Sequence, residues 1–232
     1  MKNSLPRPVV CIVHTSFVSV TQLTDLFAEL APQAQVRHIV DDTLLPEVLT
    51  NRGVTSRVRS RMCEYYKAAE LAGADLIFNQ CSSVGEVADL AANIVTVPVI
   101  KVDTRMAELA CKTGPRIGVV ATLETTLGPT CRLIESTAAR LGAKIEVTRC
   151  LVEGAFQHLI DGNRAKHNQM VLDAIRDLSR RTDVIVCAQG SMMAIVPDLG
   201  PTPVPVLTSP RLGVQSAAEW LAGRAATRAV ET

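Results

Sequence analysis

The stretch Asp75-Leu76-Ile77-Phe78-Asn79-Gln80-Cys81-Ser82-Ser83-Val84 decides the fold of this chain, because it recurs later in the sequence. Its counterpart is Asp183-Val184-Ile185-Val186-Cys187-Ala188-Gln189-Gly190-Ser191-Met192, 108 residues further on. Each stretch begins with an aspartate, continues with a short apolar run and ends in small or polar residues. A short apolar run bounded by polar residues predicts a buried strand, so each stretch is interpreted as a strand followed by a turn.

Two further blocks recur in the same order. Residues 11–15 match residues 118–122, and Val97-Pro98-Val99-Ile100 matches Val204-Pro205-Val206-Leu207, both at an offset of 107. Three blocks at nearly one offset indicate an internal duplication rather than a general likeness between strands. We therefore predict two similar α/β halves related by pseudo-twofold symmetry. The first comprises residues 1–108 and is completed by 208–232, and the second comprises residues 109–207.

Helical patterns separate the predicted strands. This alternation of strands and helices predicts right-handed crossovers and mostly parallel sheets. The predicted strands are Val9–Val13, Leu76–Phe78, Val97–Ile100, Ile117–Val120, Val184–Val186 and Val204–Leu207. The predicted helices are Val20–Leu30, Thr55–Ala72, Gly85–Ala92, Thr104–Cys111, Thr130–Leu141 and Ala165–Arg181.

Composition excludes several classes of partner. The 232 residues carry a formal net charge of +1 and are only 3% aromatic, which disfavours nucleic acids and anionic membranes. No run of eighteen apolar residues occurs, and residues 1–8 lack the apolar segment of a signal peptide. We expect a cytoplasmic protein.

Cysteine and histidine spacing indicates reduced thiols and no metal site. An odd number of cysteines in apolar patterns is not a disulfide framework, and the four histidines lack ligand spacing. No phosphate-binding glycine motif is present, so no cofactor is expected. The seven cysteines are Cys11, Cys63, Cys81, Cys111, Cys131, Cys150 and Cys187.

Hydroxyls and amides gather where the predicted strands end. Ligands of parallel α/β sheets bind at those ends, and two related halves facing one another predict an active site in the cleft between them. Such residues also commonly serve as helix caps or turn residues. The candidate substrate-binding residues are His14, Thr15, Ser16, Asn79, Ser82, Ser83, Thr122, Thr125, Gly190 and Ser191.

Four segments resemble the aspartate/glutamate racemase superfamily, which also includes hydantoin racemases, maleate isomerases and arylmalonate decarboxylases. The resemblance covers nearly the whole chain, and the first segment is its most specific part. The segments are Cys81-Ser82-Ser83-Val84-Gly85-Glu86, Ile117–Thr122 with Thr125, Val184–Met192 and Val204–Arg211.

The resemblance implies cofactor-independent chemistry at the carbon next to a carboxylate, with one cysteine from each half on opposite faces of that carbon. Cys81 occupies the first position, before a helix expected to begin near Ser83, whose N–H groups would favour a thiolate. Gln189 occupies the second position, where an amide cannot act as a general base. His14 or Cys187 could supply a second acid or base.

The leading interpretation is an isomerase or racemase that uses the Cys81 thiol on a small carboxylate or amino-acid-like substrate, with Gln189 as its partner position. A one-cysteine decarboxylase or lyase is the first alternative, because such chemistry needs one thiol. A non-catalytic small-molecule binding protein is the second. The resemblance also implies a homo-oligomer. Arg57, Arg59 and Arg61 are interpreted as a solvated helix face, although one could reach a substrate acid.

Overall fold

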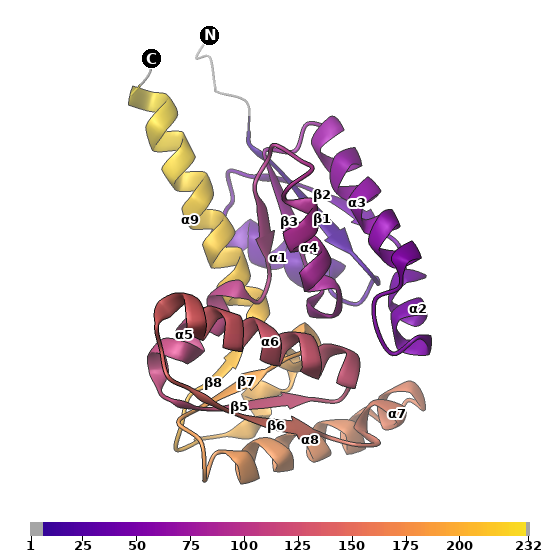
Figure 1. The fold of residues 1–232 in the computed structure, drawn as a ribbon, viewed down its shortest axis with the longest axis vertical. Helices are drawn as coiled ribbons and strands as arrows, with labels where there is room; N and C mark the ends of the chain where they lie inside the picture. Colours follow the sequence, from indigo (N-terminus) through magenta and orange to yellow (C-terminus); the bar gives the residue numbers. More distant parts are fainter. Residues whose placement is uncertain (1–6, 231–232) are drawn as a thin grey trace. The chain divides into compact units, whose positions relative to one another are not determined.

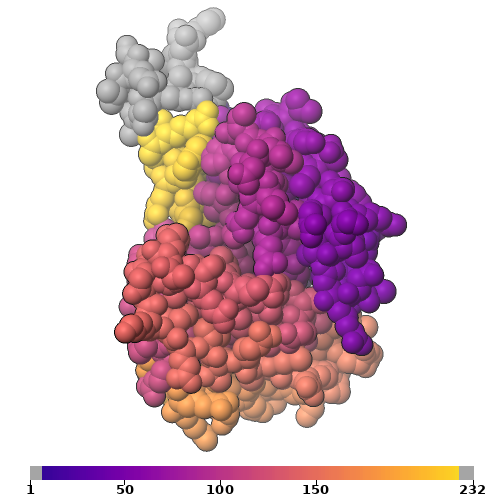
Figure 2. Space-filling view, in the orientation of Figure 1, coloured from indigo at the N-terminus to yellow at the C-terminus, as the bar shows by residue number. Residues whose placement is uncertain are grey.

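The computed structural model describes residues 7–230, and side chains are described as far as Arg224 (Figure 1). The prediction about a signal segment therefore falls mostly outside the described residues. The chain forms two compact units, Met1–Val102 with Gly213–Thr232, and Asp103–Leu212. We call them unit 1 and unit 2. In Figure 2 the described part of the chain is coloured by residue number.

Unit 1 contains a four-stranded parallel sheet in the order β2-β1-β3-β4. The two central strands, β1 and β3, are almost entirely buried, as their continuous apolar sequences predict. The strands are β1 (Val9–His14), β2 (Gln35–Val40), β3 (Leu76–Asn79) and β4 (Val99–Lys101). The helices are α1 (Val20–Leu30), α2 (Leu44–Thr50), α3 (Ser56–Leu71), the 3-10 turn η1 (Ser82–Val84) and α4 (Gly85–Ala91).

Unit 2 repeats this plan with a four-stranded parallel sheet in the order β6-β5-β7-β8. The strands are β5 (Arg116–Ala121), β6 (Glu146–Leu151), β7 (Val184–Cys187) and β8 (Val206–Thr208). The helices are α5 (Thr104–Thr113), α6 (Glu124–Leu141), α7 (Ala155–Ile160), α8 (Arg164–Leu178) and the 3-10 turns η2 (Gly190–Ala194) and η3 (Val196–Leu199). The predicted fold class, two similar parallel α/β halves, is confirmed.

The aspartate that begins each repeated stretch has the same task in both units. The Asp75 carboxylate accepts the Val9 N–H at 2.9 Å, and the Asp183 carboxylate accepts the Arg116 N–H at 2.8 Å. Each aspartate thus satisfies the first N–H of the neighbouring central strand, which would otherwise lack a partner at the sheet end. This shared bond explains why the aspartate belongs to the repeat.

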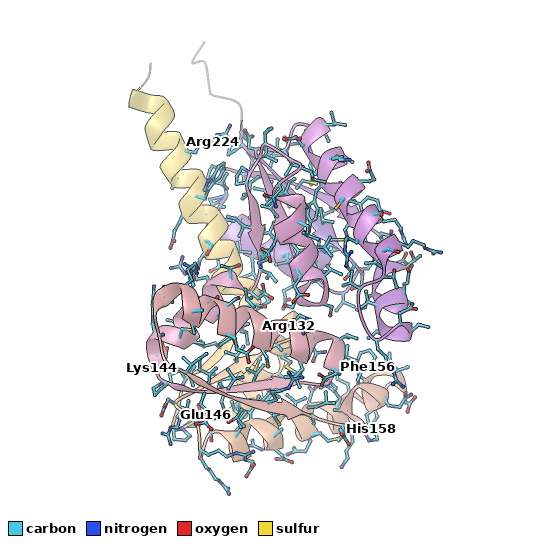
Figure 3. The ribbon with its side chains drawn as sticks, viewed as in Figure 1. Arg132, Lys144, Glu146, Phe156, His158 and Arg224 are labelled. Carbon is cyan, nitrogen blue, oxygen red and sulfur yellow. The ribbon has the colours of Figure 1, made fainter. Side chains whose placement is uncertain are left out.

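The last helix, α9 (Ser209–Val230), joins the units in sequence, and its residues from Gly213 onward belong to unit 1. Arg224, labelled in Figure 3, forms an ion pair of 3.0 Å with Asp75 and lies over the Trp220 ring. A Cβ at Gly213 would lie 2.5 Å from the Val102 carbonyl oxygen, so only glycine allows this close approach.

Two edge strands, two short helices and the start of a third helix differ from the sequence-based expectation. The edge strands β2 and β6 contain exposed and part-buried residues but no buried one, so they lack a continuous apolar run. The short helices α2 and α7 are not among the predicted helices. Helix α6 begins at Glu124 rather than at the predicted Thr130. The prediction began after Pro129 because proline is unusual inside a helix, yet here it lies within one. Proline lacks an N–H, but the preceding turn still forms through the Thr126 and Leu127 N–H groups, which donate to the Leu123 carbonyl.

Candidate functional site

Cys81 lies directly after β3, at the carboxyl edge of the unit 1 sheet. Its backbone is extended (φ −116°, ψ 115°), and it precedes the 3-10 turn η1 rather than a full α-helix. Its carbonyl accepts the Val84 N–H at 3.2 Å, which closes the turn. The N-cap positions of η1 and α4 are Cys81 and Val84, neither of which forms a side-chain cap, and Ser83 lies inside η1.

Several hydrogen-bond donors lie near the sulfur of Cys81. Burial raises the pKa of this thiol, while the Thr15 hydroxyl and the N–H groups of Ser83 and Val84 lower it. The Ser83 hydroxyl acts in the same direction. The Thr15 hydroxyl is itself buried and makes no hydrogen bond among the described residues, so it lies near the sulfur without being bonded to it. The resting thiol is therefore protonated at neutral pH, and the donors are placed to stabilise its thiolate.

Cys187 has none of these donors. It ends β7 and is fully buried in the apolar core beside Val120 and Ile185. Burial alone raises the pKa of its thiol to about 12. Burial is likewise the main reason that the pKa of Cys11 and of Cys131 is raised, to about 11 in each case. This setting is typical of a packing residue rather than of an acid or base.

A buried tyrosine and a buried asparagine form hydrogen bonds that lead to the backbone of Cys81. The Tyr66 hydroxyl, on α3, donates to Asn79 Oδ1 at 2.8 Å, and Asn79 Nδ2 donates to the Cys81 carbonyl at 3.1 Å. Both side chains are fully buried. Sequence reasoning did not identify Tyr66, because a helix tyrosine thirteen residues before the strand end gives no local signal.

Gln189 occupies the same place in unit 2. It follows β7, has an extended backbone (φ −106°, ψ 129°) and precedes the 3-10 turn η2. Its side-chain oxygen accepts the Thr122 N–H at 2.6 Å and the Thr122 hydroxyl at 3.1 Å. The amide thus anchors the end of β5, and no partner of its nitrogen is seen among the described residues.

The other candidate residues of unit 2 differ in exposure. Thr125, in the first turn of α6, has a buried hydroxyl without a partner in the described part of the chain. Ser191 is exposed, and Gly190 lies against Pro210, which a Cβ would approach to 3.4 Å. Gly190 and Ser191 lie in the 3-10 turn η2, and neither residue begins an α-helix.

In unit 1, Ser82 and Ser83 are buried in η1, and Ser16 is half-buried after β1. His14 is fully buried at the end of β1 and takes part in a chain of polar contacts. Its Nε2 lies 3.0 Å from His38 Nδ1, and its Nδ1 lies 3.5 Å from the Ser19 hydroxyl.

The contacts of His14 continue at both ends. The Ser19 hydroxyl donates to Gln80 Oε1 at 2.9 Å, and His38 Nε2 lies 3.2 Å from the Thr24 hydroxyl. Burial, followed by the nearby His38, lowers the pKa of His14 to about 4. His14 is therefore neutral at physiological pH and can donate through one ring nitrogen while accepting through the other.

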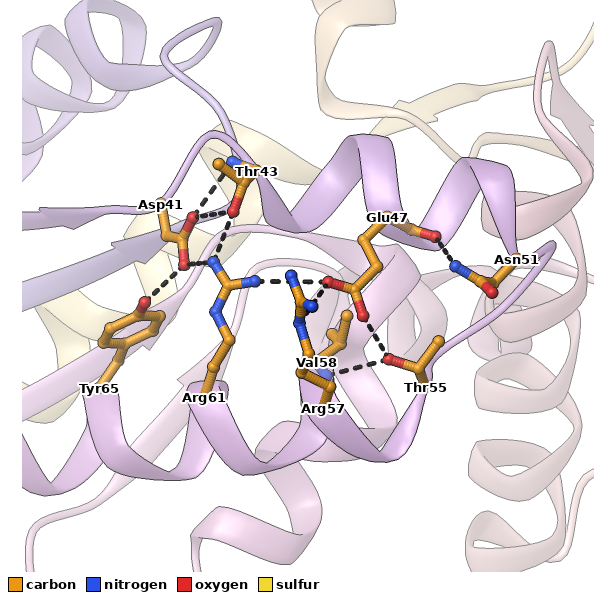
Figure 4. Close-up of polar contacts among 9 residues, drawn as sticks. All are labelled: Asp41, Thr43, Glu47, Asn51, Thr55, Arg57, Val58, Arg61 and Tyr65. Carbon is orange, nitrogen blue, oxygen red and sulfur yellow. Dashed lines mark hydrogen bonds and ion pairs between the residues drawn. The ribbon is translucent and has the colours of Figure 1, made fainter.

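Arg61 is held within a network of carboxylates (Figure 4). It pairs with Asp41 and, at 3.4 Å, with Glu47, while Tyr65 donates to Asp41 at 2.5 Å. These bonds tie α3 to the segment that follows β2. The Arg61 charge is compensated within unit 1, whereas Arg57 and Arg59 are exposed, as the solvated-face interpretation predicts. Arg57 also pairs with Glu47 at 3.3 Å.

The described residues contain no helix that is both long and apolar enough to cross a bilayer. Within the same residues, no group of three or more His, Cys, Asp or Glu side chains is arranged to hold a metal ion.

The fold is similar to that of several solved racemases. A glutamate racemase isoform from Bacillus anthracis aligns with a TM-score of 0.75 and 16% identity over 95% of this chain and 84% of that chain. An allantoin racemase from Klebsiella pneumoniae gives 0.65 and 16%, over 94% and 89%. The Picrophilus torridus aspartate racemase gives 0.66 and 11%, over 93% and 94%. At these identities the likeness concerns the fold.

A comparison with curated protein sequences found no match. The sequence pattern of the Asp/Glu/Hydantoin racemase family, in contrast, matches residues 10–217, which is most of the chain. The resemblance carried by the Cys81 turn and the repeated strands is confirmed by this match. The chain belongs to the Asp/Glu/Hydantoin racemase family.

Proposed function

We propose that the protein is a cofactor-independent isomerase or racemase acting at the α-carbon of a small carboxylate or amino-acid-like substrate through Cys81. The observation that carries the proposal is that the Thr15 hydroxyl and the N–H groups of Ser83 and Val84 lie near the Cys81 sulfur, where they lower the pKa of its thiol. Cys187, the cysteine at the end of β7, has no such donors to lower the pKa of its thiol. Family membership supports the reaction class.

In the proposed step the Cys81 thiolate removes the α-proton. The thiol first loses its own proton to solvent; then the Cα–H bond breaks, an S–H bond forms, and the electron pair remains on the substrate as an enediolate. A proton from the Cys81 thiol or from solvent returns to Cα, which re-forms the Cα–H bond and ends the enediolate. Oxygen atoms of that enediolate need hydrogen-bond donors, and the Thr125 hydroxyl, Ser16, Ser82, Gly190 and Ser191 are assigned to this task or to the substrate carboxylate. The Thr122 hydroxyl already donates to Gln189 and so holds that amide in place. Gln189 can donate through its amide nitrogen but can neither take nor give the proton.

A one-cysteine decarboxylase or lyase is the second candidate, and two observations favour it. Gln189 stands where a second thiol would be needed, and burial keeps the Cys81 thiol protonated at rest. In decarboxylation the bond between Cα and the carboxylate breaks, CO2 leaves, and the electron pair on Cα takes the proton from the thiol. That reaction uses a single thiol as an acid.

A screen across several chemical classes of α-substituted acid would identify the substrate. The protein would be incubated in D2O with panels of amino acids, hydroxy acids, hydantoins and substituted malonates, and each mixture followed by proton NMR. Deuterium at the α-carbon with inversion supports a racemase, whereas release of CO2 supports a decarboxylase. Exchange without inversion would indicate a single proton-transferring face.

Cys81→Ala serves as the blank for this screen, and Cys187→Ala is the matched control because it removes a thiol from the other unit. Turnover that persists unchanged in Cys81→Ala would contradict the thiol mechanism. Binding without exchange or CO2 release in the unaltered protein would favour the non-catalytic binding function. A homo-oligomer and a cytoplasmic location stay predictions.

A further inference from the structure

The Tyr66, Asn79 and Cys81 groups form one continuous chain of hydrogen bonds inside unit 1. Tyr66 lies on α3, Asn79 ends β3, and the chain finishes on the backbone carbonyl of Cys81 rather than on its sulfur. All the bonded side-chain atoms are buried, because Tyr66 and Asn79 are both 0% exposed.

The tyrosine decides which way the asparagine amide faces. A hydroxyl that donates to Oδ1 holds this oxygen on the tyrosine side, which directs Nδ2 toward the Cys81 carbonyl. The opposite orientation would place two oxygens, Oδ1 and the Cys81 carbonyl, against each other. The Cys81 carbonyl is thereby fixed by a hydrogen bond from the side chain of Asn79, two residues earlier in the chain.

Unit 2 shows that the turn does not need this support in order to form. Gln189 has nearly the same backbone angles as Cys81, and the Met192 N–H closes its turn at 3.0 Å. Yet Cys187 stands in the place of Asn79, since each is opposite the matching valine of the neighbouring strand. At the offset of 108, Tyr66 corresponds to Ala174, which packs against the apolar core.

A buried polar pair is costly to place where apolar residues suffice. Each buried polar group must find a hydrogen-bond partner, because without one it loses the hydrogen bonds that it makes to water in the unfolded chain. The pair occurs beneath the turn that carries a thiol, and the corresponding place beneath the Gln189 turn is apolar. The Tyr66–Asn79 pair therefore occurs with the thiol of Cys81, and it is not needed for the turn to form.

We propose that Tyr66 and Asn79 are positioning residues for the Cys81 thiol: by holding the Cys81 carbonyl they keep the N–H groups of Ser83 and Val84 directed at the sulfur. The inference rests on the proposed function, in which Cys81 is the reacting group. Loss of either side chain weakens the hold on the Cys81 carbonyl, which then keeps only the Val84 N–H as a partner. The turn donors can then move away from the sulfur, which disfavours the thiolate.

The test measures the thiol itself and requires no substrate. Iodoacetamide alkylation of Cys81 would be followed from pH 6 to pH 11 by peptide mass spectrometry, which separates Cys81 from the other cysteines. We expect Tyr66→Phe and Asn79→Ala to raise the apparent pKa of Cys81 and to slow its alkylation at pH 8 by about tenfold, the factor that corresponds to one pKa unit. The rate at high pH should be unchanged.

Tyr65→Phe is the matched control. It removes the same hydroxyl from the adjacent residue, whose partner is Asp41 rather than Asn79, so the Cys81 profile should not change. Unchanged profiles in both Tyr66→Phe and Asn79→Ala would overturn the proposal.

Faster alkylation of Cys81 together with the core thiol Cys187 would also overturn it, because the pair would then only hold the fold together. The profile can be measured whether or not Cys81 turns over a substrate. Failure of the positioning role is therefore distinguishable from failure of the proposed function.

Discussion

The turns after β3 and β7 share one backbone but carry different chemistry. Cys81 and Gln189 differ by only 10° in φ and 14° in ψ, from −116° and 115° to −106° and 129°. In unit 1 the threonine after the central strand, Thr15, faces a thiol. In unit 2 the corresponding Thr122 donates twice to an amide oxygen. The duplicated scaffold thus keeps the positions and changes the groups placed on them.

The difference extends to the neighbouring strand ends. Unit 1 has His14 where unit 2 has Ala121, and Asn79 where unit 2 has Cys187. Groups able to carry or direct a proton therefore lie in unit 1, while Gln189 of unit 2 offers only hydrogen bonds. This contrast predicts that the units respond differently to equivalent perturbations.

The largest expected effect comes from exchanging sulfur for oxygen in the unit 1 turn. Cys81→Ser keeps the size and the hydrogen bonding of the side chain, but an alcohol ionises far less readily than a thiol. We expect kcat/KM for the substrate found by the D2O screen to fall by about 1,000-fold or more, within the range for loss of an acid–base group. Initial rates of α-proton exchange would measure it.

Cys187→Ala, in the unit 2 strand, should change the same rate by less than about threefold, because its thiol is buried among apolar side chains. Equal losses of kcat/KM in Cys81→Ser and Cys187→Ala would contradict the proposed difference between the units, because both thiols would then affect activity only through folding.

The second effect concerns pH and His14. Burial lowers the pKa of His14 from 6.5 to about 4, so the unfolded chain binds more protons between these values. The stabilising effect of neutral His14 is therefore present above pH 6.5 and is lost as the pH falls toward 4. We expect unit 1 to lose roughly 1–2 kcal/mol between pH 7 and pH 5, allowing for screening by solvent.

Urea unfolding followed by Trp220 fluorescence would measure this loss, because Trp220 is the single tryptophan and its helix belongs to unit 1. His14→Gln should flatten the pH dependence, and His158→Gln, on α7 of unit 2, should leave it as it is. A pH dependence that survives in His14→Gln would assign the acid sensitivity to other groups.

The sequence was sufficient for the central strands and for the edge strands β4 and β8, but not for the other two edge strands, β2 and β6. Strands β1, β3, β5 and β7 are buried, so their apolar runs and their repetition are visible in the chain. The edge strands β2 and β6 have one exposed face and resemble loops or helices in composition. Proline at position 129 similarly conceals the first turn of α6.

For the candidate site, the repeat and the family resemblance identified Cys81 and its counterpart Gln189, whereas their supporting groups remained undetected. Tyr66 and His38 reach the site only because α3 packs on β3 and β2 pairs with β1. Such contacts depend on sheet order, which no local pattern specifies. The roles of the predicted site residues stay predictions until the variants are measured.

The smallest expected effect comes from making the two turns alike. Gln189→Cys removes the oxygen that accepts the Thr122 N–H and hydroxyl, so we expect a loss of about 1 kcal/mol, seen as a fall in Tm of about 2–4 °C. The fold should persist, because the Cys81 turn shows that this backbone tolerates cysteine.

The new thiol would lie beside the Thr122 donors, so it should react with iodoacetamide faster than Cys187 does at the same pH. If a missing second thiol limits inversion, the variant should also increase the ratio of inversion to exchange in D2O relative to the unaltered protein. A fall in Tm of about 10 °C or more would instead show that the Gln189 amide is part of the structural core of unit 2, and that the two turns differ in their structural as well as their chemical roles.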